Sequence, residues 1–450
     1  MKKNLLTVLS IIFLLVIIIN PNTNLDIGLT ILFLAIAGHI IFKEKLLLAF
    51  LLIRPTLDHW NYIEIFRYKT YIINLNAVLA ILFFLWLGFM LIKNYKAIPK
   101  KLVYLLFAIL AFLMLLSSFY SVSTIATLIE TIKFINLAMI FALSYVFIKQ
   151  NKITTSQLLK TILLSAIIPI LFGVYQLVLG KGISTFGIHG RIYGTFAHPN
   201  VFAFFVLFLL FLHIQFSSIS PTLFWQKNKK FRIAVYIFLL FLILMTYTRA
   251  ALVGLAVFLL IIGILKYRKM LAGVILSIIL ASAIFVPINF WLKTNTNYDL
   301  QRTSIIQRLT TRDEDSDSIA WRQALIRESM PIIGSRPLLG FGYGTFPLVW
   351  EENRGSSHQW DDSAEAHNDY LRLGLEIGLL GLMLYLILLG TLFFNSAKLV
   401  LNKSLQKKNL YIFAWIGAFI ILSLSDNMLH HTAVMWLMWS WLGASLVPNS

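Results

Sequence analysis

The chain of 450 residues contains no cysteine. A disulfide, a cysteine nucleophile and a cysteine-ligated metal are therefore excluded. Charge is also scarce: Asp, Glu, Lys and Arg together make up 13% of the residues, whereas about a quarter is usual in a soluble domain. Together with a hydrophobic share of 59%, this shortage of charge indicates a protein embedded in a membrane.

Acidic residues are the scarcer of the two signs, with 19 Asp and Glu against 38 Lys and Arg, a net charge of +19. In a membrane protein such an excess marks cytoplasmic segments, and we expect no nucleic-acid partner. Most lysines gather in segments such as 43–45, 93–101 and 403–408, whereas most arginines fall in the intervening segments. We therefore place the Met1 end inside. Because the guanidinium fork suits phosphate and carboxylate, the outer arginines predict an anionic ligand there.

Long apolar runs are abundant, and each can cross a bilayer core of ~30 Å. The expected spans lie at roughly 4–20, 25–42, 46–66, 72–92, 101–118, 131–148, 158–180, 200–219, 232–246, 250–266, 270–291, 369–394, 409–425 and 430–447. Two of these segments remain open as re-entrant or interfacial. The sequence thus predicts an all-α polytopic membrane protein with about 12–14 transmembrane helices.

One outer segment, residues 293–366, is much longer than the others. Loops of this length are uncommon unless they are functional or disordered. Its aromatic residues, which include Trp321, Phe346 and Trp350, favour a packed helical cap over disorder. We therefore divide the chain into N-terminal membrane helices (1–292), this extracytoplasmic loop (293–366) and C-terminal membrane helices (367–450).

Two arginines stand out because they lie at the outer ends of apolar runs. Arg191 lies in the loop GRIYGTFAHPN, and Arg249 lies in TYTRAALVG, where it interrupts a long apolar stretch. Ionisable groups at membrane depth are rare and usually functional. The alternative for both is an arginine that reaches to lipid headgroups.

The stretch AHNDYLRLGLEIGLLG begins polar and ends as a membrane segment. The spacing of His367, Leu371, Gly374, Gly378 and Gly381 places them on one face of a predicted helix. Such glycines allow close helix packing, and a helix N-terminus favours a neutral imidazole that can accept a proton. The alternative is a histidine hydrogen-bonded in the loop–helix junction.

These motifs, in this order, resemble the O-antigen ligase and polymerase superfamily, which comprises bacterial membrane glycosyltransferases of GT-C-like fold. The resemblance covers about residues 190–385 and is most specific at HN-x9-GxxG, which starts at His367. The RP-x-x-D stretch of Arg54, Pro55 and Asp58 resembles the early motif of the family.

The resemblance implies a donor glycan on undecaprenyl pyrophosphate and catalysis without a metal or cofactor. Arg191 and Arg249 would hold the pyrophosphate, and His367 would activate or orient the acceptor hydroxyl. The expected supporting residues are Asn368, Gly374, Gly378, Gly381, Asn200, Arg54 and Asp58. The acidic run 313–317 could bind a divalent ion through its oxygens, but a solvated loop is the favoured interpretation.

The favoured function is an inverting, metal-independent ligase of the inner (plasma) membrane with lipid A–core as the acceptor and the active site on the extracytoplasmic side. A surface-polysaccharide polymerase, whose acceptor is another glycan, stays open. A transporter or flippase of lipid-linked sugars is the alternative of another class. It does not require a structured loop as long as 293–366, and it favours two similar halves, which the sequence lacks.

Overall fold

The computed structural model describes residues 37–60, 64–68, 71–185, 188–219, 228–269, 271–273, 276, 318–353, 365–401 and 406–447. Within these residues the protein is mostly helical, and six helices are long and apolar enough to cross a membrane. They are Asn76–Ala97, Leu102–Phe119, Thr124–Lys149, Thr155–Val178, Pro199–Ser217 and Gly378–Leu401. The predicted all-α polytopic membrane fold is therefore confirmed. The segment 4–20 and most of 25–42 and 270–291 lie outside the described residues.

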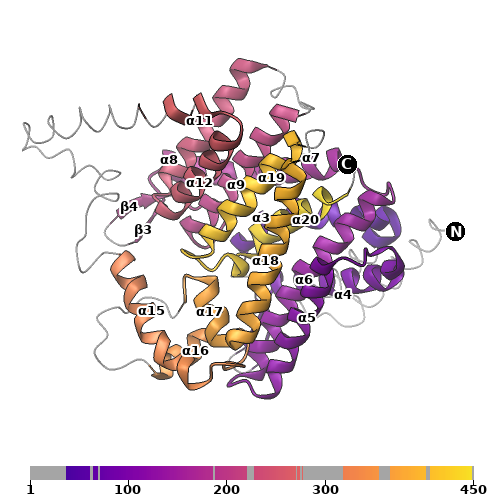
Figure 1. Cartoon of the computed structure of the whole chain (residues 1–450), viewed down its shortest axis with the longest axis vertical. Helices are drawn as coiled ribbons and strands as arrows, with labels where there is room; N and C mark the ends of the chain where they lie inside the picture. Colours follow the sequence, from indigo (N-terminus) through magenta and orange to yellow (C-terminus); the bar gives the residue numbers. More distant parts are fainter. Residues whose placement is uncertain are drawn as a thin grey trace, which may run out of the picture.

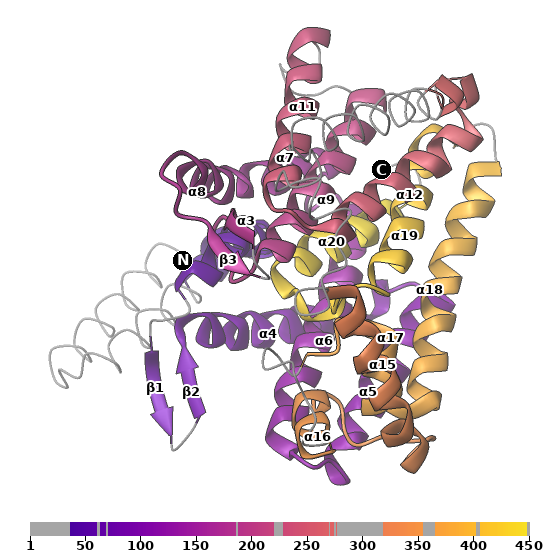
Figure 2. The ribbon, with the colours of Figure 1, turned by 90° about the vertical axis from the view of Figure 1, so that its left-hand side faces the viewer.

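In the first part of the chain, helices α4, α5 and α6 lie together on one side of the bundle, whereas α8 lies on the opposite side (Figure 1). Its elements are α3 (Leu46–Leu57), β1 (Glu64–Tyr68), β2 (Tyr71–Asn74), α4 (Leu75–Asn94), α5 (Leu102–Leu116), α6 (Thr124–Lys149), α7 (Thr155–Ser165) and α8 (Ile167–Val178). β1 and β2 form an antiparallel hairpin that projects beside α4 (Figure 2).

The second part adds a short hairpin and the remaining helices. Its elements are β3 (Ile183–Thr185), β4 (Ile188–Arg191), α9 (Pro199–Ile219), α11 (Lys229–Met245), α12 (Arg249–Leu265), α15 (Ser318–Ser335), α16 (Phe346–Asn353), α17 (Asp369–Glu376), α18 (Gly378–Leu401), α19 (Gln406–Leu422), η6 (Met428–His430) and α20 (Thr432–Ser445).

The centre of the bundle is formed by α6, α9 and α20. α20 packs against α6 along its length, and it also contacts α3, α7 and α9. Gly443 permits the close approach, since a Cβ there would collide with the carbonyl of Phe141 on α6. By contrast α4, α5 and α18 expose large apolar side chains such as Phe112 and Phe394. These outer faces suit contact with lipid tails, which are the expected membrane partner.

Three predicted spans differ from the structure. The span 46–66 is wrong at its end, because α3 stops at Leu57 and the chain enters β1 at Glu64. The span 158–180 corresponds to the membrane-length helix Thr155–Val178, which is interrupted at Ala166 between α7 and α8. The span 369–394 is divided at Gly378, whose φ of +66° is not helical. Hydropathy detects these runs, but it does not report where the backbone turns within them.

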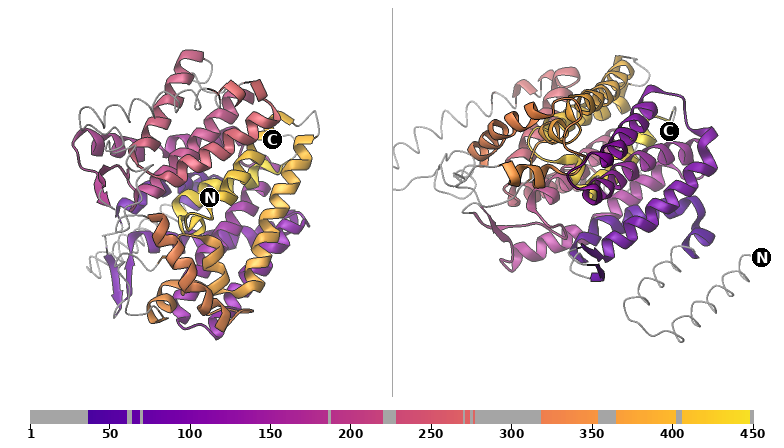
Figure 3. Two further views of the ribbon diagram at one scale, coloured as in Figure 1. Left: turned by 60° about the vertical axis from the view of Figure 1, so that its left-hand side comes forward. Right: turned by 90° about the horizontal axis from the view of Figure 1, so that it is seen from below.

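The described part of the long loop folds as a helical cap. α15 and α16 enclose a small apolar core with α17, formed by Leu325, Ile332, Phe346, Val349, Trp350, Ala366, Leu371 and Leu375. Figure 3 shows the cap at one end of the bundle, close to the start of α18. The glycine-rich turn before α16 is bonded to α17: Phe341 N donates to Leu375 O at 3.1 Å and Gly342 N to Glu376 O at 2.8 Å. Its glycines therefore serve close packing within the protein.

Candidate functional site

His367 lies in the junction between the cap and α17, not on the helix. Asn368 is the N-cap of α17 and accepts hydrogen bonds from the backbone of Tyr370 and Leu371. Its own N–H donates to Asn427 Oδ1 at 3.0 Å, which fixes the junction to the turn before η6. His367 itself has φ +43°, a left-handed conformation that is uncommon outside glycine and recurs at functional sites.

The predicted stripe of His367 and three glycines on one helix face is wrong. The helix begins at Asp369 and ends at Glu376, so His367 precedes it and Gly378 follows a break. A Cβ at Gly378 would collide with the backbone of Leu338, whereas a Cβ at Gly374 meets nothing closer than 3.7 Å. Gly378 is thus needed for a turn against the cap, and Gly381 faces the side chain of Ile377.

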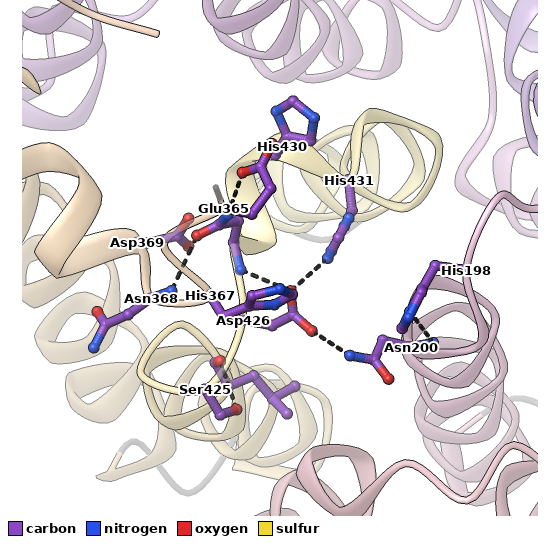
Figure 4. A network of polar contacts seen from close by, with 12 residues as sticks. His198, Asn200, Glu365, His367, Asn368, Asp369, Ser425, Asp426, His430 and His431 are labelled. Atoms are coloured by element: carbon purple, nitrogen blue, oxygen red, sulfur yellow. Dashed lines mark hydrogen bonds and ion pairs between the residues drawn. The ribbon is translucent and has the colours of Figure 1, made fainter. Parts of the chain in front are cut away.

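Asp426 connects the residues around His367 (Figure 4). Its Oδ1 lies 3.4 Å from His367 Nδ1 and 3.0 Å from His431 Nε2, and its Oδ2 accepts from Asn200 Nδ2 at 2.8 Å. Burial would raise the pKa of this carboxyl, but His431 and His367 together hold it well below its ordinary value. Asp426 is therefore a buried carboxylate that orients two imidazoles and one amide.

The contact with Asp426 also selects a tautomer for His367. A carboxylate facing Nδ1 favours the proton on that nitrogen, which leaves the lone pair on Nε2. A histidine held in this way can accept a proton at Nε2, while the carboxylate stabilises the resulting imidazolium. The geometry therefore suits a general base.

Arg191 is buried, with an exposed fraction of 1%, and bonds to two polar segments. Its Nε donates to Thr246 O at 2.9 Å, and its Nη2 donates to Asn200 Oδ1 at 3.1 Å and to Thr248 Oγ1 at 3.4 Å. These contacts connect Arg191 through Asn200 to Asp426. They also place Arg191 at the turn that leads directly into Arg249.

Arg249 is the first residue of α12, and it is partly buried. Thr248, the N-cap, makes no side-chain hydrogen bond to the start of the helix, because its hydroxyl contacts Arg191 and Asn200 instead. Arg249 therefore coincides with the positive end of the α12 dipole, where an anion is favoured.

The early motif braces this site from α3. Arg54 donates to Asp58 Oδ1 at 2.7 Å and to Thr432 Oγ1 at 2.6 Å, and its guanidinium lies over the ring of Trp436. The carbonyl of Pro55 accepts from Thr195 Oγ1 at 2.6 Å, within the loop that follows Arg191. The motif thus supports both the start of α20 and the Arg191 loop.

A second polar network joins α17, η6 and α6. Arg372 Nε donates to Glu376 Oε1 at 2.9 Å, one helical turn along α17, and its Nη1 lies 3.1 Å from His430 Nδ1. Glu130 of α6 faces both Arg372 and His430, at 3.6 Å and 3.5 Å. This network ties α17 to α6 and supports the cap.

Sequence reasoning missed Asp426 and His431. A usable signal existed, because Asp426 is the acidic residue in the otherwise acid-free stretch 409–447 and is followed closely by two histidines. Acids at membrane depth are rare and often functional, and Asp426 directly follows the expected span 409–425. Among the described residues no group of three or more His, Asp or Glu is arranged to hold a metal ion, and the run 313–317 lies outside them.

Comparison with known proteins gives one family. Residues 234–386 match the family model described as O-antigen ligase, a range that contains Arg249 and His367 but neither Arg191 nor Asp426. No curated protein matches the chain. The match supports the superfamily of O-antigen ligases and polymerases, whose members are glycosyltransferase-like membrane enzymes.

Proposed function

The chain matches the O-antigen ligase family model over residues 234–386. We propose that the protein is a membrane glycosyltransferase that transfers a glycan from undecaprenyl pyrophosphate to an acceptor hydroxyl. The observation that carries the proposal is the pairing of His367 with the buried carboxylate of Asp426 at 3.4 Å, connected through Asn200 to Arg191. This arrangement places a candidate general base, His367, in the same polar network as the positive charge of Arg191.

The transfer is an inverting displacement at the anomeric carbon of the donor. His367 Nε2 takes the proton of the acceptor hydroxyl as its oxygen forms the new glycosidic bond. The bond between the anomeric carbon and the pyrophosphate oxygen breaks, and undecaprenyl pyrophosphate leaves with the electron pair. Asp426 stabilises the resulting imidazolium of His367. General acid–base catalysis of this kind typically raises the reaction rate by about 10²–10⁴-fold.

The leaving pyrophosphate is stabilised from the turn that joins α11 to α12. Arg249 contacts it directly at the N-terminus of α12, where the helix dipole adds partial positive charge. Arg191 orders the same turn through Thr246 and Thr248 and contributes its charge from within the protein. Fixed positive charge aimed at a developing anion is often the largest catalytic factor.

We place the site on the extracytoplasmic face of the inner membrane. The lysine-rich segments mark the cytoplasm, and the cap formed by α15 and α16 packs against α17, directly after His367. The acceptor approaches from the cap and the donor from the membrane, so that they meet at His367.

Lipid A–core is the proposed acceptor, and a growing glycan is the alternative that makes the enzyme a polymerase. Surface polysaccharide from a deletion strain separates the two. Long glycan chains that remain unattached to lipid A–core indicate a ligase, whereas single attached repeats indicate a polymerase.

The test of the activity is transfer by purified protein with lipid-linked donor and acceptor, with a chelator present throughout. His367→Ala should retain donor binding and lose most transfer. His39→Ala is the matched control, because His39 is bonded to Trp86 on α4, outside this site. Near-normal transfer by His367→Ala would remove the base from the mechanism. Activity that requires an added divalent ion would contradict the metal-independent reaction.

A further inference from the structure

His198 is a histidine at the edge of the site for which the mechanism above has no role. It directly precedes α9, and Figure 4 shows it beside Asn200, on the side of Asp426 that Asn200 contacts. Its ring is close enough to interact electrostatically with Arg191, Asp426, His367 and His431. His198 is therefore part of the same polar region.

One ring nitrogen of His198 is already occupied. Its Nδ1 accepts the backbone N–H of Asn200 at 3.1 Å, in the manner of a helix cap. A neutral imidazole whose Nδ1 accepts must carry its proton on Nε2. In the described part of the chain no protein group accepts a hydrogen bond from that Nε2. The ring therefore presents a donor with a fixed tautomer.

The surroundings keep this donor neutral. Burial is the main cause that lowers the pKa of His198 to about 4; the charges of Arg191, His367 and His431 act in the same direction, and Asp426 opposes them. The start of a helix also disfavours a protonated imidazole. Near neutral pH His198 is consequently a neutral imidazole that can donate a hydrogen bond through Nε2.

The partner of such a donor should be an anion. The Asp426 carboxylate is already engaged, since Oδ1 is contacted by His431, His367 and the N–H of Asn427 and Oδ2 accepts from Asn200. Arg191 adds positive charge to the same region. Because the carboxylate is engaged and Arg191 adds positive charge, the region favours phosphate oxygens, which accept strong charge-assisted hydrogen bonds.

We propose that His198 is a further donor-binding residue, whose Nε2–H donates to the pyrophosphate of the lipid-linked substrate. This inference rests on the proposed function, because it assumes an undecaprenyl-pyrophosphate donor. His198 holds one of the phosphate oxygens before and during cleavage, while Arg249 contacts the pyrophosphate from the N-terminus of α12.

Two substitutions separate this role from simple capping. In His198→Asn, the side-chain oxygen can replace Nδ1 as the cap acceptor, but the Nε2–H is lost. In His198→Gln, the terminal amide can replace the Nε2–H donor, but the cap acceptor is lost. The probe is sugar-free undecaprenyl pyrophosphate, with its Kd measured on purified full-length protein and accompanied by the KM values for donor and acceptor.

The asparagine variant should weaken binding of undecaprenyl pyrophosphate about 10- to 100-fold, the usual loss for a hydrogen bond to a charged group. Its Tm should stay near that of the wild type. The glutamine variant should recover most of the lost affinity and show a lower Tm. If the asparagine variant does not fold, the affinity of the glutamine variant decides alone, because recovered binding requires the donor.

The opposite pattern overturns the proposal. Wild-type affinity in His198→Asn together with weakened binding in His198→Gln would make His198 a cap only. If His198→Asn raised only the KM for the acceptor, His198 would bind the acceptor and not the donor, which contradicts the proposal. Failure of the wild type to bind undecaprenyl pyrophosphate would instead contradict the proposed donor, so the two failures are distinguishable.

Discussion

The side-chain amide of Asn200 donates to Asp426 Oδ2 across 2.8 Å, and its oxygen accepts from Arg191 at 3.1 Å. Asn200 lies at the start of α9, whereas Asp426 follows α19. This amide therefore joins the arginine side of the site to the histidine side. A substitution at Asp426 should therefore disturb the positions of both the arginine and the histidine side chains.

Asp426→Asn should lower kcat by about 10²–10⁴-fold, because a neutral amide cannot stabilise the imidazolium of His367. The measurement is single-turnover transfer from lipid-linked donor by purified protein. Glu365→Gln is the matched control: it removes a nearby carboxylate that contacts Asn427 rather than His367. A rate within a few-fold of wild type in Asp426→Asn would show that His367 works without this partner.

Arg191→Lys and Arg249→Lys should fail in different ways. A lysine at 191 cannot bond simultaneously to Thr246, Thr248 and Asn200, so the variant should lose thermal stability as well as activity. A lysine at 249 should weaken donor binding while it leaves Tm nearly unchanged. Tm and donor Kd measured side by side check this, and full activity in Arg249→Lys and Arg249→Ala would retire Arg249 as a donor ligand.

Gly378→Ala should reduce the amount of folded protein and cost more than about 1 kcal/mol of stability, because a residue with φ +66° and a blocked Cβ position must strain the backbone. Gly374→Ala is the control. It lies inside α17, where an added Cβ would make only ordinary contacts at 3.7 Å with the side chains of Ile333 and Leu382, and alanine should be neutral or stabilising there. If thermal denaturation gave the same Tm for both variants, the close contact between Gly378 and the backbone of Leu338 in the cap would be contradicted.

The orientation can be checked with single cysteines, since the native chain has none. Leu338→Cys in the cap, where the side chain is 68% exposed, should react with a membrane-impermeant maleimide in intact spheroplasts. Lys269→Cys, beyond the end of α12, should react after permeabilisation only. The reverse pattern would place the cap in the cytoplasm and contradict the donor assignment.

The sequence by itself determined the class of the protein and pointed to several candidate site residues. Long apolar runs with so few charges are stable only inside a membrane. Each run is contiguous in the sequence, so it is visible without the fold. Arg191, Arg249 and His367 were visible for a related reason, because a polar side chain at the end of an apolar run is costly and therefore conspicuous. The ion pair of Arg372 with Glu376 is likewise local, because residues four apart are neighbours on a helix.

Only the tertiary structure decided how these residues are arranged. Asp426 contacts His367 because the turn after α19 folds back onto the start of α17, and no spacing in the sequence encodes that approach. Likewise, Arg191 is buried because the Thr246–Thr248 turn and Asn200 surround its guanidinium. Gly378 fits the predicted helical spacing equally well as part of a helix or as a break in it. The carbonyl of Leu338, brought there by the cap, decides for the break, because a steric contact between distant segments exists only once the chain has folded.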